Sequence, residues 1–388
     1  MVGTLPGRTQ GLGLITEPLI ADLGIDRLSY AAVNFWATLI GAAFCLPTGR
    51  LTDRFGPRIV LAGTAAALGL TVIFMSETVT LIGIGFAITL TRGFGQSALS
   101  VVSLAAVGKW FASRLGVAMG VYSLLVGIGF IIAFPSVGQA AVTYGWRATC
   151  LGVGLAITLI VAPVAWLVVR DCPDAGFLAD ASASESREDV SFAAALRTRA
   201  FWIFSLASSL FSMVYSGIAL FNQSILEQRG FDASTYHTVL VISTTIGLAA
   251  NFAGGWLASW WPIQKLTGIG MGTLAASLLV LPFATTFAHV VVYATAMGIA
   301  GGVVTVVFFS VWGHVFGRRQ LGRIQGSAQM MTVFASAIGP FVLAKTLEQT
   351  GSYASVFFLL GAVIAMLAIA SWRVRLPDDS VAKKSRRV

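Results

Sequence analysis

The stretch Gly49-Arg50-Leu51-Thr52-Asp53-Arg54-Phe55-Gly56-Pro57-Arg58 is a short island of charge between two long apolar runs. The run before it, residues 30–46, and the run after it, residues 59–75, each approach the length that a helix needs to cross a bilayer. Because so few residues separate the runs, the chain must reverse direction within a tight turn. The sequence therefore predicts two antiparallel membrane helices joined at a membrane surface by this charged segment.

The composition is typical of an all-α membrane protein. Of 388 residues, 56% are hydrophobic and only 11% are charged, which is too little charge for the surface of a soluble protein of this length. Residues 1–23 form a weak apolar stretch, and eleven stronger ones follow, so we expect twelve transmembrane helices. The eleven stretches are residues 30–46, 59–75, 81–107, 117–141, 151–169, 201–220, 239–261, 266–288, 290–312, 327–347 and 353–372.

The net charge of +9 reflects topology rather than nucleic-acid binding. If the twelve helices alternate in direction, most of the 25 Lys and Arg residues fall on the side of the charged segment, and the opposite side receives only Arg27, Arg147 and Arg229. The positive-inside rule then places this segment and both termini in the cytoplasm. We expect an integral protein of the plasma or inner membrane that is a monomer in the lipid bilayer and has no nucleic-acid partner.

The two halves of the chain align when the sequence is shifted by 206 residues. Gly24 then falls on Gly230 and Gly145 on Gly351, and other matched pairs are Gly49 with Gly255, Gly116 with Gly322, and Gly120 with Gly326. This series predicts two parallel six-helix repeats. We expect an N-terminal half at residues 1–170, a cytoplasmic linker at 171–199, a C-terminal half at 200–375 and a basic cytoplasmic tail at 376–388. Within the linker, residues 192–196 are expected to form a short interfacial helix.

The same shift aligns Met1 with Ala207, whereas the seventh helix is expected to begin near Ala200. The first helix is therefore expected to be truncated by roughly two turns at its cytoplasmic end. The alternative is a short first helix around which the bilayer becomes thinner.

Four charged residues inside predicted spans are candidate functional residues, because charge there is costly and is usually retained for function. One of them, Lys345, lies near the outer end of residues 327–347 and one turn from Glu348, so we interpret it as a side chain that extends to the membrane surface beside an acid. Arg8 lies near the middle of the first helix, Arg92 lies midway along residues 81–107, and Glu17 follows Arg8 further out. If both arginines faced one narrow cavity, their guanidinium groups would favour an anionic substrate, because the planar fork matches a carboxylate. The alternative for both arginines is hydrogen bonding to carbonyls of a neighbouring helix. Glu17 is interpreted either as an acid of the outer vestibule or as a proton-coupling carboxylate.

Neutral polar residues complete the candidate substrate site: Gln10, Tyr215, Asn222, Gln223, Asn251 and Trp312. Cys45, Cys150 and Cys172 lack metal or redox spacing, and we predict no metal and no cofactor. No Ser/His/Asp set lies at a shared depth, and the chain has no phosphate-binding Gly-Lys-(Ser/Thr) loop. An enzyme and an ATP-driven pump are therefore not expected.

The charged segment resembles the loop between the second and third helices of the major facilitator superfamily, Gly-x-Leu-(Ala/Ser)-Asp-Arg-x-Gly-Arg-(Arg/Lys). Its gating residues would be Gly49, Asp53, Arg54, Gly56 and Arg58, whereas Thr52 and Pro57 depart from the pattern. The resemblance implies a transporter that works by alternating access. It also implies that Asp53 stabilises one conformation by meeting a helix amino terminus from the other half. The second half has Ser259 and Trp260 at the positions equivalent to Asp53 and Arg54, so we expect this device on one side only.

Further motifs narrow the resemblance. Arg92-Gly93-Phe94-Gly95-Gln96 is similar to the helix-four arginine motif of the superfamily, whose arginine is associated with the substrate cavity and with proton coupling. Lys109-Trp110-Phe111-x-x-Arg114 and Gly145-Trp146-Arg147 resemble the oxalate–formate antiporter and monocarboxylate porter branches, although residues 239–261 lack the arginine that these porters often carry. The resemblance implies secondary active transport of a small organic anion of the monocarboxylate class, by proton symport or exchange. The alternatives are proton-coupled efflux of amphiphilic drugs and a receptor without transport activity.

Overall fold

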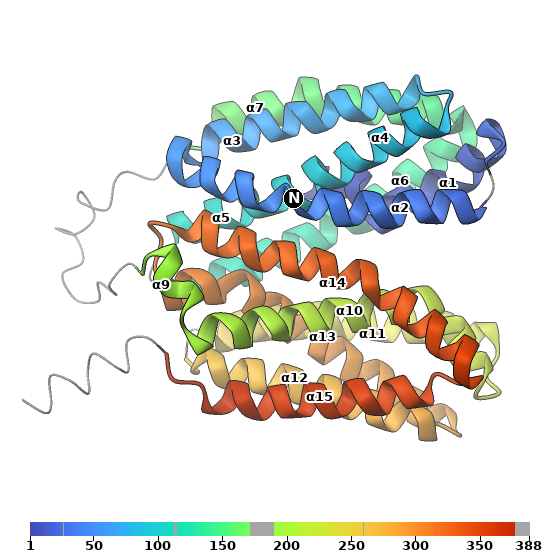
Figure 1. Ribbon diagram of the computed structural model, residues 1–388, viewed down its shortest axis with the longest axis vertical. Coiled ribbons are helices and arrows are strands. Elements are labelled where there is room, and N and C mark those ends of the chain that lie inside the picture. The colour runs from blue at the N-terminus through green and yellow to red at the C-terminus, as the bar shows by residue number, and fades with distance from the viewer. Residues whose placement is uncertain (26, 112–114, 171–189, 259, 377–388) are drawn as a thin grey trace, which may run out of the picture. The chain divides into compact units, whose positions relative to one another are not determined.

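The computed structural model describes residues 1–25, 27–111, 115–170, 190–258 and 260–376. Over these ranges the chain is helical and contains no strand (Figure 1). The helices are η1 (Val2–Gly7), α1 (Thr9–Leu23), α2 (Arg27–Ala42), α3 (Cys45–Ser76), α4 (Leu81–Thr91), η2 (Arg92–Leu99), α5 (Ser100–Trp110), α6 (Leu115–Ala156), η3 (Ile157–Val161), α7 (Ala162–Val168), α9 (Phe192–Leu196), α10 (Arg199–Glu227), α11 (Ala233–Leu257), α12 (Ile263–Val280), η4 (Leu281–Phe283), α13 (Phe287–Phe316), α14 (Leu321–Thr350) and α15 (Ala354–Arg373).

Eight helical stretches of the described chain are long and apolar enough to cross a membrane. Two of them, Ser29–Ser76 with 48 residues and Leu115–Val168 with 54 residues, are more than twice as long as the roughly 20 residues that one crossing requires. Each contains a glycine with a positive φ, Gly56 (φ 81°) and Gly145 (φ 81°), at which helical geometry is interrupted. Glycine suits these positions because it lacks the Cβ that makes this conformation unfavourable.

The structure refines the expectation for the charged segment. Residues 49–55 continue the helical course of α3, and the reversal is confined to Gly56, after which Pro57 begins the next helical stretch. Proline is favoured at the start of a helix because its missing N–H is not needed there. The predicted tight turn is therefore a single residue.

The chain divides into two compact units. The first comprises Met1–Trp110, Leu125–Asp189 and Arg318–Val333, and the second comprises Phe111–Leu124, Val190–Gly317 and Phe334–Val388. Helices α6 and α14 thus contribute residues to both units.

In the first unit, α3 packs against α4, α5 and α7, and α2 packs against α4 and η2. The core is apolar and includes Leu68, Val72 and Ile88. Close approaches rely on glycine: a Cβ at Gly69 would lie 2.8 Å from the carbonyl oxygen of Gly154. Such small-residue contacts are a common way to pack helices in membranes.

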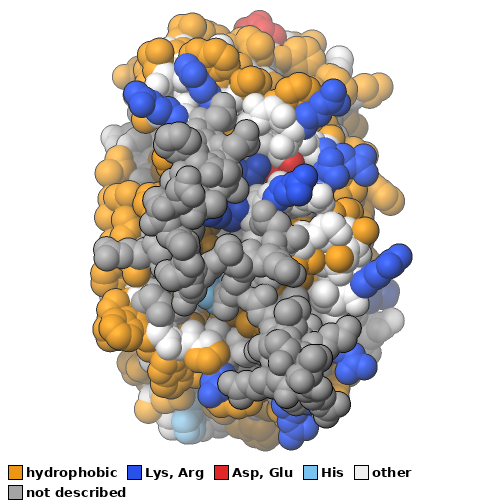
Figure 2. Space-filling view, turned by 90° about the vertical axis from the view of Figure 1, so that its left-hand side faces the viewer, with side chains coloured by type: hydrophobic (Ala, Val, Ile, Leu, Met, Phe, Trp, Pro, Cys, Tyr) orange, Lys and Arg blue, Asp and Glu red, His pale blue; other side chains and the backbone are white. Residues whose placement is uncertain are grey.

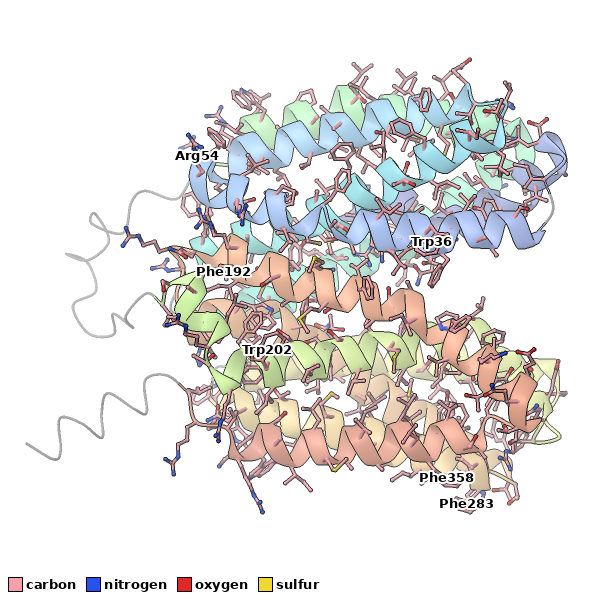
Figure 3. The ribbon with its side chains drawn as sticks, viewed as in Figure 1. Trp36, Arg54, Phe192, Trp202, Phe283 and Phe358 are labelled. Carbon is pink, nitrogen blue, oxygen red and sulfur yellow. The ribbon has the colours of Figure 1, made fainter. Side chains whose placement is uncertain are left out.

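In the second unit, α13 packs against α11 and α12, and α12 also packs along α15 (Figure 1). Helix α9 occupies the five residues at which the sequence predicts a short helix, and the hydroxyl of Ser191 accepts a hydrogen bond from the Ala194 amide at its start. Both units expose large apolar side chains, among them Trp36 of the first unit and Phe283 and Phe358 of the second (Figure 3). Such surfaces suit contact with lipid.

Candidate functional site

The first helical region is broken at Arg8. The 3-10 helix η1 ends at Gly7, Arg8 has an extended backbone (φ −89°, ψ 152°), and α1 begins at Thr9. The break brings the Leu5 carbonyl oxygen against Gly11, where a Cβ would collide with it. Among the described residues, no side chain caps the start of α1. A helix start has amides without intrahelical partners and carries partial positive charge, so the break is electropositive.

Arg8 and Gln10 lie together at this break. The Nε of Arg8 donates a hydrogen bond to Thr4 Oγ1 at 2.8 Å, and its guanidinium lies over the ring of Phe130, 5.2 Å from the centroid. The Arg8 side chain is half-buried, whereas Thr9 and Gln10 are exposed. The arrangement therefore places a guanidinium and a polar amide side chain beside an uncapped helix start.

Arg92 lies deeper, with a relative exposure of 2%, at the first residue of the π-helix η2. Its Nε and Nη2 donate to Asn34 Oδ1 at 3.2 and 2.7 Å. Its Nη1 lies 3.2 Å from the Gly7 carbonyl oxygen, 3.0 Å from Thr9 Oγ1 and 2.8 Å from Gln96 Oε1. Each of these acceptors is neutral. One contact, to the backbone carbonyl of Gly7, is of the kind named in the alternative prediction, and the other acceptors are side-chain oxygens.

Three of these partners were missed by sequence reasoning. Gln96 follows Arg92 by four residues, a spacing at which side chains of one helix meet, and could have been found. Asn34 is a polar residue within an apolar run, which is a signal in itself. Thr9 offers no local signal, because its contact depends on the break at Arg8.

The predicted polar residues of the second unit are differently placed. Asn222, Asn251 and Trp312 are buried, and Asn222 Oδ1, Asn251 Oδ1 and Trp312 Nε1 have no hydrogen-bond partner within the described part of the chain. Tyr215 is 49% exposed and stacks on Phe211. Trp312 is surrounded by aromatic rings; these belong to Phe201, Phe308 and Phe316. The side chains of Gln223 and Glu17 lie outside the described residues, so their roles stay predictions.

Asp53 caps the start of α14. Its two carboxylate oxygens accept hydrogen bonds from the amides of Gly322 and Arg323, both at 2.9 Å. Lys109 Nζ lies 3.0 Å from Asp53 Oδ1, and the two side chains are only 13% and 6% exposed. Arg318 donates to the Lys109 carbonyl oxygen at 2.9 Å. The contact with a helix amino terminus is the one that the resemblance implies, whereas the ion pair with Lys109 was not expected.

The other residues of the charged segment differ in their surroundings. Gly49 lies against the Gly322 carbonyl oxygen so closely that a Cβ would collide with it. Arg54 is exposed and extends outward from α3 (Figure 3), with its guanidinium over the ring of Phe55. Arg58 donates to the Trp166 carbonyl oxygen at 2.7 Å and lies over the Trp166 ring. Figure 2 shows Lys and Arg side chains gathered on the face that it presents.

Comparison with known proteins decides the family. The family model of the Major Facilitator Superfamily matches residues 9–288 and 220–388. The chain belongs to the Major Facilitator Superfamily. It is 26% identical over 346 residues to monocarboxylate transporter 13 of Rattus norvegicus, with 86% of this chain and 78% of that protein covered. It is 23% identical over 381 residues to the hexuronate transporter of Bacillus subtilis, with 92% and 88% covered.

The solved structures agree on the fold of this superfamily member. The crystal structure of the human organic anion transporter MFSD10 superposes with a TM-score of 0.71 and 14% sequence identity, covering 95% of this chain and 96% of that one. The chain therefore has the all-helical transporter fold of the superfamily and is an integral membrane protein.

Proposed function

We propose that this superfamily member is a secondary active transporter of a small organic anion, a monocarboxylate or a sugar acid, which binds at the break beside Arg8. The observation that carries the proposal is the half-buried guanidinium of Arg8 next to the uncapped start of α1. A helix amino terminus attracts anions through its free amides and its dipole. The guanidinium adds a full charge and a fork that fits a carboxylate.

The relatives support an anionic substrate. Their names specify monocarboxylates and hexuronates, and the solved transporter is one of organic anions. These compounds share a carboxylate and differ in the rest of the molecule. We infer that the carboxylate is the group recognised at Arg8, with Gln10 contacting the remainder.

We further propose twelve membrane crossings in two six-helix repeats, with residues 1–170 and 200–375 as the halves and both termini in the cytoplasm. Positive-φ glycines support the repeat: Gly24 pairs with Gly230, and Gly145 pairs with Gly351, at the same shift of 206 residues that aligns the halves. The interruptions at Gly56 and Gly145 divide the two longest helical stretches. The distribution of Lys and Arg supports the orientation.

The contact of Asp53 with the start of α14 is proposed to stabilise the state in which the cytoplasmic end of the transporter is closed. A carboxylate at a helix start stabilises the helix dipole, and the ion pair with Lys109 adds to this. Opening this end requires the contact to break. The coupling is proposed to be proton symport or exchange, with Glu17 as the candidate proton carrier.

The test is counterflow of radiolabelled lactate, gluconate and glucuronate in proteoliposomes. Arg8→Gln removes a charged partner of the substrate, which typically costs about 2–5 kcal/mol, or roughly a 30- to 4,000-fold loss of affinity. Arg8→Lys keeps the charge without the fork and should fall between Arg8→Gln and the parent.

Lys345→Gln is the matched control, because it also removes a cation from a membrane helix. Its ion pair with Glu348 is exposed, with side chains 48% and 68% accessible, so little should change. Folded Arg8→Gln protein that exchanges all three anions at the parent rate would overturn the proposal. Transport of a lipophilic cation such as tetraphenylphosphonium by that variant would then favour drug efflux.

A further inference from the structure

We propose that Arg92 is a positioning residue, which fixes the break in the first helical region so that Arg8 and the start of α1 are presented to the substrate. The inference rests on the role proposed above for Arg8. It assigns different tasks to the two arginines: Arg8 contacts the substrate, and Arg92 acts through Arg8.

The hydrogen bonds of Arg92 leave no nitrogen of its guanidinium for a substrate. A guanidinium has five N–H donors on three nitrogens. Nε and Nη2 contact Asn34, and Nη1 contacts Gly7, Thr9 and Gln96. With 2% of the residue exposed, a carboxylate could reach Arg92 only after several of these contacts had broken.

Two of these acceptors flank Arg8 directly. The Gly7 carbonyl precedes the break, and the Thr9 hydroxyl follows it. One planar group therefore fixes the residues on both sides of the extended one. Tight packing on η2 supports this arrangement: a Cβ at Gly7 would lie 2.7 Å from the Gln96 amide and would collide with the Thr91 carbonyl oxygen.

The break needs such support because it is unfavourable within a membrane. A continuous helix satisfies its backbone amides internally, whereas a break leaves amides without partners where water is scarce. Hydrogen bonds from a charged donor are stronger than neutral ones, so Arg92 can stabilise the broken form. Asn34 and Gln96 hold the guanidinium in place from α2 and η2.

A double-mutant cycle distinguishes positioning from direct contact. We expect Arg92→Gln to lower carboxylate affinity at least about tenfold in the parent, and less than about twofold further in the Arg8→Gln background. Two independent substrate contacts would instead give multiplied effects. Asn34→Leu removes the Oδ1 atom that accepts two hydrogen bonds from Arg92 and changes no charge, so it should weaken binding in the same pattern.

A second readout does not depend on the substrate. A spin label on Gln10→Cys, in a background without Cys45, Cys150 and Cys172, reports the backbone next to the break. We expect Arg92→Gln to raise the mobility of this label and to leave a label on Gly13→Cys, one turn further along α1, nearly unchanged. Thermal melting of each variant controls for misfolding.

Substitutions at two glycines of α1 test the break without changing Arg92. Gly11→Ala places a methyl group where the Leu5 carbonyl oxygen lies and should reproduce the Arg92→Gln effects even if Arg92→Gln itself fails to fold. Gly13→Ala is the matched control, since no described atom lies within 4 Å of its would-be Cβ.

The inference would be overturned if the affinity losses of Arg8→Gln and Arg92→Gln multiplied and the mobility of the label at Gln10 did not change. Arg92 would then be a substrate contact. A mobile label at Gln10 with unchanged binding in Arg8→Gln would uphold the positioning role, because the break would still depend on Arg92. That result would overturn only the proposed substrate site.

Discussion

The start of α14 packs on α3 in the first unit, and the start of α6 packs on α11 in the second unit, through matching glycines. At the α3–α14 junction, Gly322 lies against Gly49. At the α11–α6 junction, a Cβ at Gly255 would lie 2.9 Å from the Gly116 carbonyl oxygen. These four positions correspond under the 206-residue shift. Both junctions thus depend on the same close backbone approach.

The junctions differ in charge. The α3–α14 junction adds the Asp53 carboxylate, two amides of α14 and Lys109. In the second half the sequence has Ser259 and Val315 at the positions of Asp53 and Lys109, and Ser259 lies outside the described residues. We infer two tasks from this difference: the glycines set how closely the helices approach, and the buried carboxylate adds to the free energy that their separation requires.

The largest effect is expected from Asp53→Asn. The change removes the carboxylate charge that lies 3.0 Å from Lys109 Nζ in a mostly buried site, and losing one partner of a buried pair costs about 3–5 kcal/mol. Alkylation of Cys45 measures how readily α3 and α14 separate. Cys45 is fully buried, and a Cβ at Gly326 of α14 would lie 2.6 Å from the Cys45 carbonyl oxygen. We expect alkylation of Cys45 to accelerate strongly relative to Cys150 in a Cys172→Ser background. An unchanged rate of Cys45 alkylation would contradict the proposal that the Asp53–Lys109 pair holds this junction together.

Lys109→Gln should have a smaller effect. Asp53 keeps its two amide donors and loses its charge-assisted contact with Lys109, which is worth about 1.5–3 kcal/mol. Thermal melting and Cys45 alkylation should both change in the direction of Asp53→Asn. In the Asp53→Asn background, Lys109→Gln should add little, and full additivity would show that the two residues act separately.

The glycine contacts are expected to matter in both junctions. Gly49→Ala and Gly255→Ala each force a methyl group into backbone, and such overpacking costs about 1–3 kcal/mol. Both variants should melt at lower temperature. Gly63→Ala in α3 is the control, because its would-be Cβ meets no described atom within 4 Å. A loss of stability at only one junction would show that the two junctions do not depend on glycine in the same way.

The smallest effect is expected from Ser259→Ala. With no carboxylate at this position, the change should stay within about 0.5 kcal/mol and leave counterflow intact. Counterflow losses equal to those of Asp53→Asn would show that the second junction is also a polar gate.

The sequence predicts some helices correctly because apolar length is a local property. Residues 192–196 form the expected helix α9, and the apolar run at 290–312 lies within α13. The contact of Asp53 with a helix start was predicted through the family resemblance. Its ion pair with Lys109 was not, because no local pattern connects residues so far apart in the chain.

The break at Arg8 shows the limit of such reasoning. Pro6 and Gly7 weaken a helix, but where it ends depends on Thr91, Gln96 and Arg92, which are far away in the sequence. A hydropathy pattern does not distinguish Arg8 from Arg92, because both are charged residues inside apolar spans. Their burial and hydrogen bonds distinguish them, and these follow from tertiary packing.

The single-residue reversal at Gly56 has a consequence for biosynthesis. With no loop between them, the two helical arms of Ser29–Ser76 cannot enter the bilayer far apart in time, and we expect them to insert together as a hairpin. The arginines at the tip would then remain on the side of synthesis. The arms that meet at Gly145 are likewise joined without a loop, but their tip carries Arg147 and is expected on the opposite side. An epitope tag or protease site inserted at Gly56 would separate the arms, so it should reduce membrane insertion itself rather than transport by an inserted protein.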